Sequence, residues 1–202
     1  PYSGVQLQGT AATEVRRHGA SFEVVTAESC IHAKTVLLAY GVKDDLPPIP
    51  GLEAFWGSSV LHCPYCHGWE VRDEPLAYVA SGDAAIEFGK LLLGWSRDLV
   101  LCTNGGEELS AGQREALTRN GIEVREQTIS RLRGPDGMLT EIVFADGSVL
   151  SGRALFVRPA QHPGSGLDVQ RGCARTEAGF LQVDEFGRTS VPGVYAAGDL
   201  IT

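Results

Sequence analysis

Two cysteines, Cys63 and Cys66, are separated by two residues, a spacing that lets a pair of thiols close a short disulfide ring and open it again. Pro64 stiffens the turn between them, and His67 follows directly. The imidazole of histidine ordinarily titrates near neutral pH, so His67 is suited to carry the proton that thiol chemistry moves. The pattern indicates a reversible two-electron redox pair.

Three other interpretations fit the same residues. A zinc ribbon needs a second C-x-x-C pair, and the other cysteines are isolated in the sequence: Cys30, Cys102 and Cys173. The run from Cys63 to His67 also matches C-x-x-C-H, the attachment signature of c-type haem. Such proteins often supply a methionine as the distal ligand of the haem, and Met138 is the one methionine in the chain. The plainest alternative is two buried cysteines in a turn. We expect no metal site.

A second candidate site lies near the end of the chain, where Gly198 and Asp199 follow the apolar run 194–197. Small residues at a strand end let the backbone approach a ligand closely, and the carboxylate of Asp199 could bind a hydroxyl group or a pyrophosphate-bound water. A simple strand and turn explains this run equally well.

The composition narrows the classes of partner. The 202 residues include 17 basic and 25 acidic ones, so the formal charge of −8 argues against nucleic acid or an anionic membrane. No run of 18 apolar residues suggests a membrane span. Five scattered cysteines fit a reducing compartment, the cytoplasm. The chain begins at Pro1 and stops at Thr202 just after a strand-like run, which indicates a fragment.

Alternating strands and helices are expected between the two candidate sites. Segments 75–80, 84–95 and 98–102 predict a strand, a helix and a strand, a βαβ unit with parallel strands. Further strands are expected at 5–13, 22–27, 34–39, 122–132, 154–157, 180–183 and 193–197, a helix at 110–120, and a hairpin at 140–150 with a type I′ turn at Asp146-Gly147. The proline-rich segment 46–51 predicts a crossing between two domains.

The order of these motifs is more specific than any one of them. His62-Cys-Pro-Tyr-Cys-His-Gly68, a βαβ turn about fifteen residues later, and Thr189-Ser-Val-Pro-Gly-Val-Tyr-Ala-Ala-Gly-Asp199 together resemble the thioredoxin reductase-like, FAD-dependent pyridine nucleotide-disulfide oxidoreductases. The branch with C-P-[YF]-C-H-G, which includes fungal and bacterial dithiol-oxidising enzymes, is the most similar. The resemblance covers the chain from Ala39 onward.

The resemblance implies an α/β fold of two Rossmann-like, three-layer ββα domains, the second inserted in the first. Residues 1–52 and 161–202 would belong to the FAD-binding domain, and residues 53–160 would form the NAD(P)-type domain that carries the cysteines. Ala39, Gly41, Gly198 and Asp199 would contact FAD. Cys66 would face the flavin, Cys63 would meet the substrate, and His67 would move the proton.

Two departures from the family bear on cofactor binding. The first FAD fingerprint, G-x-G-x-x-G, is missing from the chain, as is the C-terminal helix, so the polypeptide is expected to hold FAD poorly. The second nucleotide turn is degenerate, because Ala80 replaces the first glycine before Ser81, Gly82, Asp83 and Ala84. Carboxylates at Glu107 and Glu108 stand where arginines would bind a 2′-phosphate, so NADPH use is doubtful.

The expected activity is that of an FAD-dependent NAD(P)H:disulfide oxidoreductase similar to thioredoxin reductase. Electrons would pass from flavin through the cysteine pair to a thioredoxin-like protein or a small disulfide. The alternatives are oxidation of a small dithiol by oxygen without NADPH, a c-type haem electron carrier, and a nucleotide-binding module without turnover. The full-length protein is expected to be a homodimer.

Overall fold

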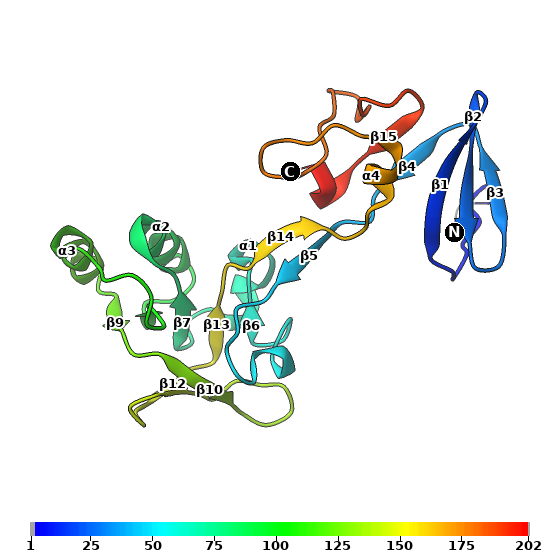
Figure 1. The fold of residues 1–202 in the computed structure, drawn as a ribbon. Helices are drawn as coiled ribbons and strands as arrows, with labels where there is room; N and C mark the ends of the chain where they lie inside the picture. The colour runs from blue at the N-terminus through cyan, green and yellow to red at the C-terminus, as the bar shows by residue number, and fades with distance from the viewer. Residues whose placement is uncertain (1–2, 202) are drawn as a thin grey trace. The chain divides into compact units, whose positions relative to one another are not determined.

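The chain divides into two compact units. A computed structural model describes residues 3–201, with the side chains of Val169 and Arg171 outside the description. One unit comprises residues 1–45 and 161–202, and the other comprises residues 46–160, so the second is inserted in the first (Figure 1). The inserted unit begins at Leu46 rather than after Leu52, because Ile49 and Leu52 are buried in its core.

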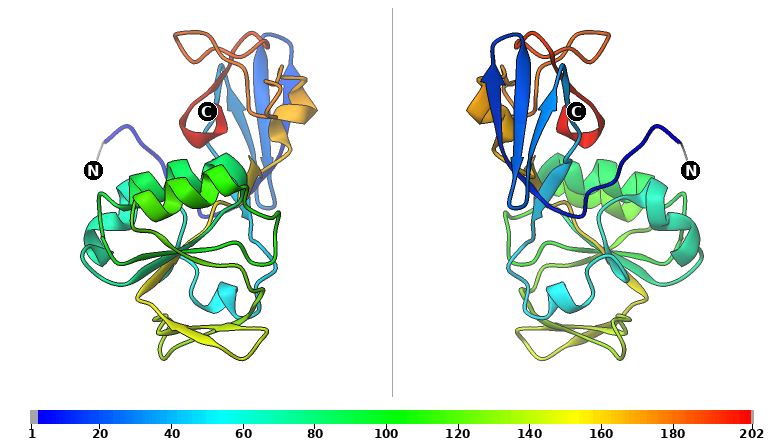
Figure 2. Two further views of the ribbon diagram at one scale, coloured as in Figure 1. Left: turned by 90° about the vertical axis from the view of Figure 1, so that its left-hand side faces the viewer. Right: turned by 90° about the vertical axis from the view of Figure 1, so that its right-hand side faces the viewer.

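The inserted unit is built on a five-stranded parallel sheet. Its strand order is β6 (Val60–Leu61), β13 (Ala154–Phe156), β7 (Leu76–Val79), β8 (Leu99–Cys102) and β9 (Glu123–Arg125). Helices α2 (Gly82–Leu92) and α3 (Ala111–Arg119) lie together on one face (Figure 2). An antiparallel sheet of β10 (Ile129–Arg133), β11 (Glu141–Phe144) and β12 (Val149–Ser151) packs on the other. The expected βαβ unit and three-layer ββα order are both present.

Alternation along the strands explains the two cores. In β7, Leu76 and Tyr78 pack under the helices while Ala77 faces the antiparallel sheet. The same alternation in β13 sends Phe156 to the helices and Leu155 to the other side. Since successive side chains of a strand point to opposite faces, a strand that is apolar throughout can fill two cores at once.

Three short helical segments belong to the inserted unit outside the sheet. They are the 3-10 helix η1 (Leu52–Ala54), helix α1 (Pro64–His67) and the 3-10 helix η2 (Gly68–Val71). Two residues separate β6 from α1, and η2 follows α1 directly; Cys63 is the N-cap of α1, and Cys66 lies within it.

The other unit has three small sheets. β1 (Ala12–His18), β2 (Ser21–Thr26) and β3 (Cys30–Ala33) form an antiparallel meander, and β4 (Val36–Leu38) pairs in parallel with β15 (Val194–Ala196). β5 (Val42–Asp45) pairs with β14 (Ala160–Pro163), and α4 (Leu167–Arg171) and the 3-10 helix η3 (Gly198–Ile201) complete the unit. Its core includes Phe22, Leu38 and Val194.

Several sequence predictions need correction. The first strand spans Ala12–His18 instead of 5–13, because the earlier segment leaves Leu7 93% exposed and gains no pairing. The single strand expected at 122–132 is two strands in different sheets, interrupted where the Asn104 side chain accepts a hydrogen bond from the Ile129 N–H (2.7 Å). The run 180–183 contributes only an isolated bridge between Leu181 and Arg175.

The hairpin between β11 and β12 is confirmed, but its turn type is not. Gly147 has a φ of 84°, whereas Asp146 is not among the residues with positive φ, and type I′ needs both. Instead the Phe144 N–H donates to the Ser148 carbonyl (2.9 Å) across a three-residue loop. Asp146 supports this loop by accepting from the N–H and hydroxyl of Ser148.

Helices of the described part of the chain, residues 3–201, are all too short or too polar to cross a membrane.

Candidate redox and cofactor sites

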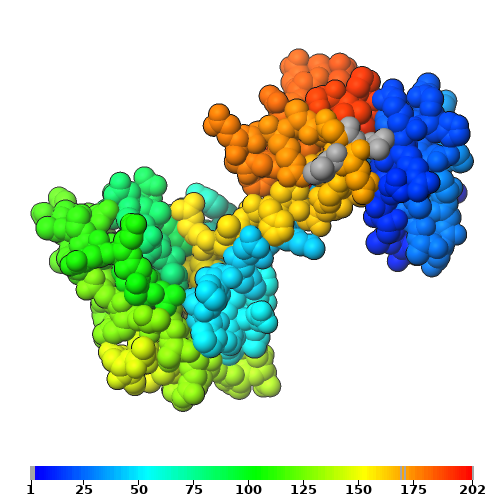
Figure 3. Space-filling model, viewed as in Figure 1, coloured from blue at the N-terminus to red at the C-terminus, as the bar shows by residue number. Residues whose placement is uncertain are grey.

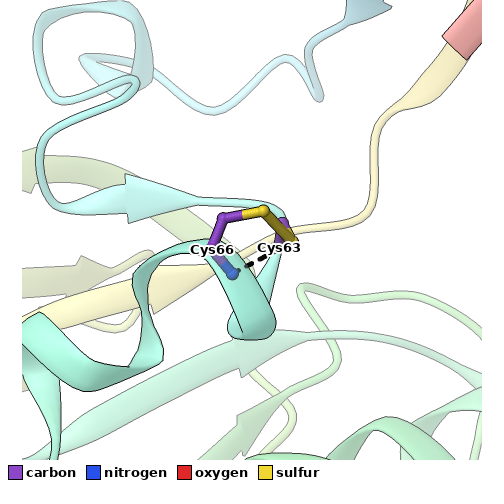
Figure 4. The surroundings of a disulfide bond; sticks show 2 residues. All are labelled: Cys63 and Cys66. Atoms are coloured by element: carbon purple, nitrogen blue, oxygen red, sulfur yellow. Dashed lines mark hydrogen bonds between the residues drawn. A yellow bond between two sulfur atoms is a disulfide. The ribbon is translucent and has the colours of Figure 1, made fainter. Parts of the chain in front are cut away.

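Cys63 and Cys66 are joined in a disulfide, with their Cα atoms 5.3 Å apart (Figure 4). Cys63 is the N-cap of α1, and its Sγ accepts a hydrogen bond from the Cys66 N–H (3.2 Å). Pro64 occupies the first helical position, where its missing N–H costs nothing. Cys63 is half-buried and Cys66 is exposed. Because the cysteines bond to each other, neither a zinc ribbon nor a haem thioether describes this pair.

The surroundings of the disulfide are unusually open. His67 ends α1, is half-buried, and its N–H donates to the Cys63 carbonyl (3.2 Å). Tyr65 is 76% exposed and Trp69 is 63% exposed. The Arg72 guanidinium lies 3.7 Å from the centre of the Trp69 ring and donates to the Trp69 carbonyl (2.7 Å), a cation–π contact that holds the indole at the surface.

Buried packing fixes the loop that carries the disulfide. Gly68 has an ordinary helical φ of −63°, so its backbone conformation would accept any residue. A Cβ at this position would lie 2.5 Å from the Trp95 ring, so the glycine is required for space. Before β6, the buried Ser59 hydroxyl donates to the Gly137 carbonyl (2.9 Å) and accepts from the Leu139 N–H (2.8 Å).

The degenerate nucleotide turn lies at the carboxyl end of β7. Ser81 is the N-cap of α2, and its side chain makes no capping hydrogen bond. Gly82 has a φ of 56° with open space around it. A pocket of about 400 Å³ adjoins the turn, and its lining includes Ala80, Ser81, Ala84 and Arg158. Asp83 is not part of the pocket lining, and its carboxylate accepts a hydrogen bond from the Gln113 side chain (2.9 Å).

Arg158 is the residue that sequence reasoning missed at this turn. It is exposed, directly follows the buried segment 154–157, and lines the pocket two residues beyond the end of the neighbouring strand β13. An arginine beside a helix N-terminus fits the pyrophosphate of a pyridine nucleotide in both charge and geometry. The signal was available, since a charged residue at the carboxyl end of a buried parallel strand lies where such ligands bind.

The segment after β8 differs from a 2′-phosphate site. Glu107 and Glu108 are exposed there. The nearby Arg114 pairs with Glu126 (2.7 Å) and lies 3.9 Å from Glu108, so its charge is already balanced by carboxylates. The hydrogen bond from Arg114 lowers the pKa of Glu126 and keeps that carboxylate ionised.

The four residues expected at FAD come together at one edge of a two-stranded parallel sheet. Ala39 and Gly41 follow β4, and Gly198 and Asp199 follow β15, which pairs with β4. Gly41 and Gly198 have φ values of 64° and 74°, with nothing within 4 Å of either Cβ position. Asp199 is exposed and lies in the first turn of η3, which begins at Gly198. Open glycines and an acidic group at strand ends fit a dinucleotide that approaches the backbone closely.

A buried polar network lies close to this edge. The Tyr40 hydroxyl donates to the Asp168 carboxylate, and Arg175 binds the same carboxylate through two nitrogens (2.9 and 2.6 Å). Burial and the hydrogen bond to Asp168 raise the pKa of Tyr40, so its hydroxyl stays protonated as a donor. The network secures the turn that contains Ala39 and Gly41.

Comparison with known proteins agrees with this geometry. Residues 3–202 match the family described as pyridine nucleotide-disulphide oxidoreductase. Thioredoxin reductase sirT of Leptosphaeria maculans is 30% identical, covering 98% of this chain and 66% of the relative, and thioredoxin reductase aclD of Aspergillus oryzae is 27% identical, covering 98% and 67%. The chain spans about two thirds of the length of these relatives.

Solved structures give the same result. The crystal structure of HlmI superposes with a TM-score of 0.89 at 36% identity, covering 98% of this chain and 64% of the other. A putative thioredoxin reductase TrxB from Bacillus anthracis gives 0.90 at 32% identity, covering 99% and 68%. The chain belongs to the pyridine nucleotide-disulphide oxidoreductase family. The expected two-domain α/β fold is confirmed, and FAD and NAD(P)H are the cofactors of this family.

Proposed function

We propose that the chain is part of a flavoenzyme in which electrons pass between FAD and the Cys63–Cys66 pair, and between that pair and an external thiol or disulfide. The observation that carries the proposal is the disulfide itself, placed at the start of a short helix with Cys66 exposed. A structural disulfide is typically shielded from exchange, whereas an exposed one can be reduced and re-formed.

We assign different roles to the two sulfur atoms. In the reductive direction, the Cys63 thiolate attacks the substrate disulfide, forming a mixed disulfide and releasing one substrate thiolate. The Cys66 thiolate then displaces the second substrate sulfur and re-forms the internal disulfide. The Cys66 N–H hydrogen bond to Cys63 Sγ would stabilise negative charge on Cys63, which supports it as the attacking atom. His67 supplies the proton that the departing substrate thiolate needs.

The two units would divide the cofactors. Residues 1–45 and 161–202 would hold FAD through Ala39, Gly41, Gly198 and Asp199, and residues 46–160 would hold the pyridine nucleotide beside Ser81, Gly82 and Arg158. When bound, the flavin would couple two-electron transfer from a nicotinamide to the thiol–disulfide chemistry of the cysteine pair. The chain's own residues position the disulfide and bind the phosphates.

NADH suits this chain better than NADPH. Arg158 and the α2 N-terminus would bind the pyrophosphate that both nucleotides share. Glu107 and Glu108 would repel a 2′-phosphate, which only NADPH carries. If neither nucleotide reduces the flavin, the second candidate function is oxidation of a small dithiol by oxygen, in which electrons leave the cysteine pair through FAD.

The substrate is proposed to be a thioredoxin-like protein or a small disulfide. Trp69 and Tyr65 present exposed aromatic surface beside the sulfur atoms, which could contact either. Two of the three cysteines outside the disulfide are buried, which suits a reducing compartment such as the cytoplasm. A homodimer is proposed for the full-length protein.

Anaerobic mixing of the FAD-loaded full-length flavoprotein, of which this chain is part, with each nucleotide tests the proposal. NADH should bleach the flavin absorbance faster than NADPH, and a thioredoxin-type disulfide should restore it. Cys66→Ser should abolish turnover, retain bound flavin, and accumulate a mixed disulfide at Cys63 that mass spectrometry detects. Cys30→Ser is the matched control and should keep full turnover. Full activity in Cys66→Ser would contradict the proposed role.

A further inference from the structure

The meander β1–β3 carries a cluster of potential metal ligands on one face. Its three strands pair side by side near the N-terminus of the chain, and their atoms are coloured blue in Figure 3. Val15 and Phe22 point into the core of the unit, so the alternate residues point to the other face. His18, Glu23 and His32 occupy that face, one from each strand.

Pairing register brings the three side chains together. Glu23 on the central strand lies directly opposite His32 on β3, and His18 on β1 lies one diagonal step away because it pairs with Ser21. The His18 Nδ1 is 2.9 Å from the Glu23 Oε1, and the His32 Nδ1 is 3.8 Å from the same oxygen. One ligand atom from each residue lies within 4.8 Å of the other two.

These spacings are close to those of a coordinated metal. Ligands about 2.1 Å from a tetrahedral zinc ion stand about 3.4 Å from one another. The histidine side chains are 68% and 66% exposed, so small rotations of their rings meet little resistance. The Glu23 side chain is only 21% exposed and is held by its position on the central strand. The carboxylate therefore provides a fixed point to which two mobile rings can converge.

Local charge favours a cation at this position. Arg16 is the residue opposite Glu23 on β1, but its guanidinium binds the Glu14 carboxylate at 2.6 Å. That ion pair partly balances the positive charge of Arg16, so the guanidinium repels a cation bound at Glu23 less strongly. Two imidazoles and one carboxylate form a ligand set that suits borderline divalent ions such as Zn²⁺.

We infer that His18, Glu23 and His32 form a binding site for a divalent transition-metal ion, with Zn²⁺ as the reference ligand. Three protein ligands leave at least one coordination position for water, as in open zinc sites. An ion bound there links all three strands of the meander and stabilises this unit by mass action. The inference is independent of the redox function, because it uses no residue of the disulfide or of the cofactor sites.

Isothermal titration of the oxidised protein with zinc chloride tests the inference. All proteins carry Cys30→Ser, so that no exposed free thiol contributes a ligand. Zinc should bind with one-to-one stoichiometry, and His18→Gln or His32→Gln should weaken the affinity about tenfold or more, where tenfold equals about 1.4 kcal/mol. Glu23→Gln should weaken it similarly, because a neutral amide is a poorer ligand.

His162→Gln is the matched control. His162 is also exposed and also lies near a carboxylate, Asp45 (3.4 Å), but within residues 3–201 no third ligand joins that pair. Its substitution should leave zinc affinity unchanged. In a two-dimensional NMR spectrum of the imidazoles, zinc should shift His18 and His32 and leave His162 in place. Absence of saturable binding at millimolar zinc, or equal affinity in the His18→Gln and control proteins, would overturn the inference.

Discussion

Ser59→Ala is expected to weaken the inserted unit sharply, although the change removes a single oxygen atom. The Ser59 side chain is fully buried next to β6, the strand that leads to the cysteine pair. Its hydroxyl makes two hydrogen bonds, one donated to the Gly137 carbonyl and one accepted from the Leu139 N–H. These bonds tie β6 to a loop that is 78 residues away in sequence.

The cost arises mainly at Leu139. Gly137 keeps a second donor in Ser58, whose hydroxyl lies 2.7 Å from the same carbonyl oxygen. Leu139 is 1% exposed, so its N–H loses its partner where water has little access. A buried donor without a partner costs about 1–3 kcal/mol, which gives a loss of about 2 kcal/mol for Ser59→Ala. At a urea m-value of about 2 kcal/mol/M, the unfolding midpoint falls by about 1 M.

Tryptophan fluorescence during urea unfolding measures this loss selectively. The three tryptophans of the chain all lie in the inserted unit: Trp56, Trp69 and Trp95. Ser58→Ala is the matched control, because its exposed hydroxyl contacts the same carbonyl and water can replace it, at a cost of about 0.5 kcal/mol or less. If the two variants lose equal stability, the buried Leu139 N–H is not what makes Ser59 necessary.

Two further substitutions test packing and protonation. Gly68→Ala should lower the free energy of unfolding by about 1–3 kcal/mol, since its methyl group would enter the Trp95 ring. Gly112→Ala, on the open face of α3, is the control and should be neutral or stabilising. Thermal unfolding compares the two variants, and unchanged stability in Gly68→Ala would refute the close contact. Burial raises the pKa of Tyr78 above the value near 10 of an unfolded tyrosine, so the unfolded chain loses this proton first and stability falls as pH rises above about 10. Tyr78→Phe should lose about 1 kcal/mol of stability at pH 8, because it removes the hydrogen bond to the Ala85 carbonyl. Its stability should also fall less between pH 8 and pH 11 than that of the unsubstituted protein. Urea midpoints that fall by the same amount in both proteins over this range would contradict the prediction.

Local signals explain what the sequence could predict. The cysteine spacing and Pro64 together determine a turn that brings two sulfur atoms within bonding distance, so the disulfide needs little tertiary information. The βαβ unit was likewise predictable, because β7, α2 and β8 each contain a strong apolar pattern with turn residues between them.

Long-range pairing explains what the sequence could not predict. The strand expected at 122–132 breaks in the polar run 125–128. The pairing of its two halves with different sheets depends on distant residues such as Asn104, whose side chain accepts a hydrogen bond from the Ile129 N–H. The proximity of His18, Glu23 and His32 was not predicted from the sequence, since no spacing rule joins residues on three strands. Their proximity depends on the register of the meander, which the turn at Gly19 sets through its φ of 61°.

The distance between the redox pair and the nucleotide turn depends on a strand that contains neither. β13 lies between β6 and β7, and all three run in parallel, so the strand ends that lead to the disulfide and to the turn lie at the same edge of the sheet, about 10 Å apart, two strand spacings. The Leu155 and Val157 N–H groups donate to the carbonyls of Ser59 and Leu61, which locks β6 in register just before Cys63. Arg158 directly follows Val157 and lines the pocket beside Ser81 that is proposed for the pyridine nucleotide. The buried segment 154–157 therefore positions both the cysteine pair and the pocket beside Ser81, although it lies about a hundred positions from the cysteines in sequence.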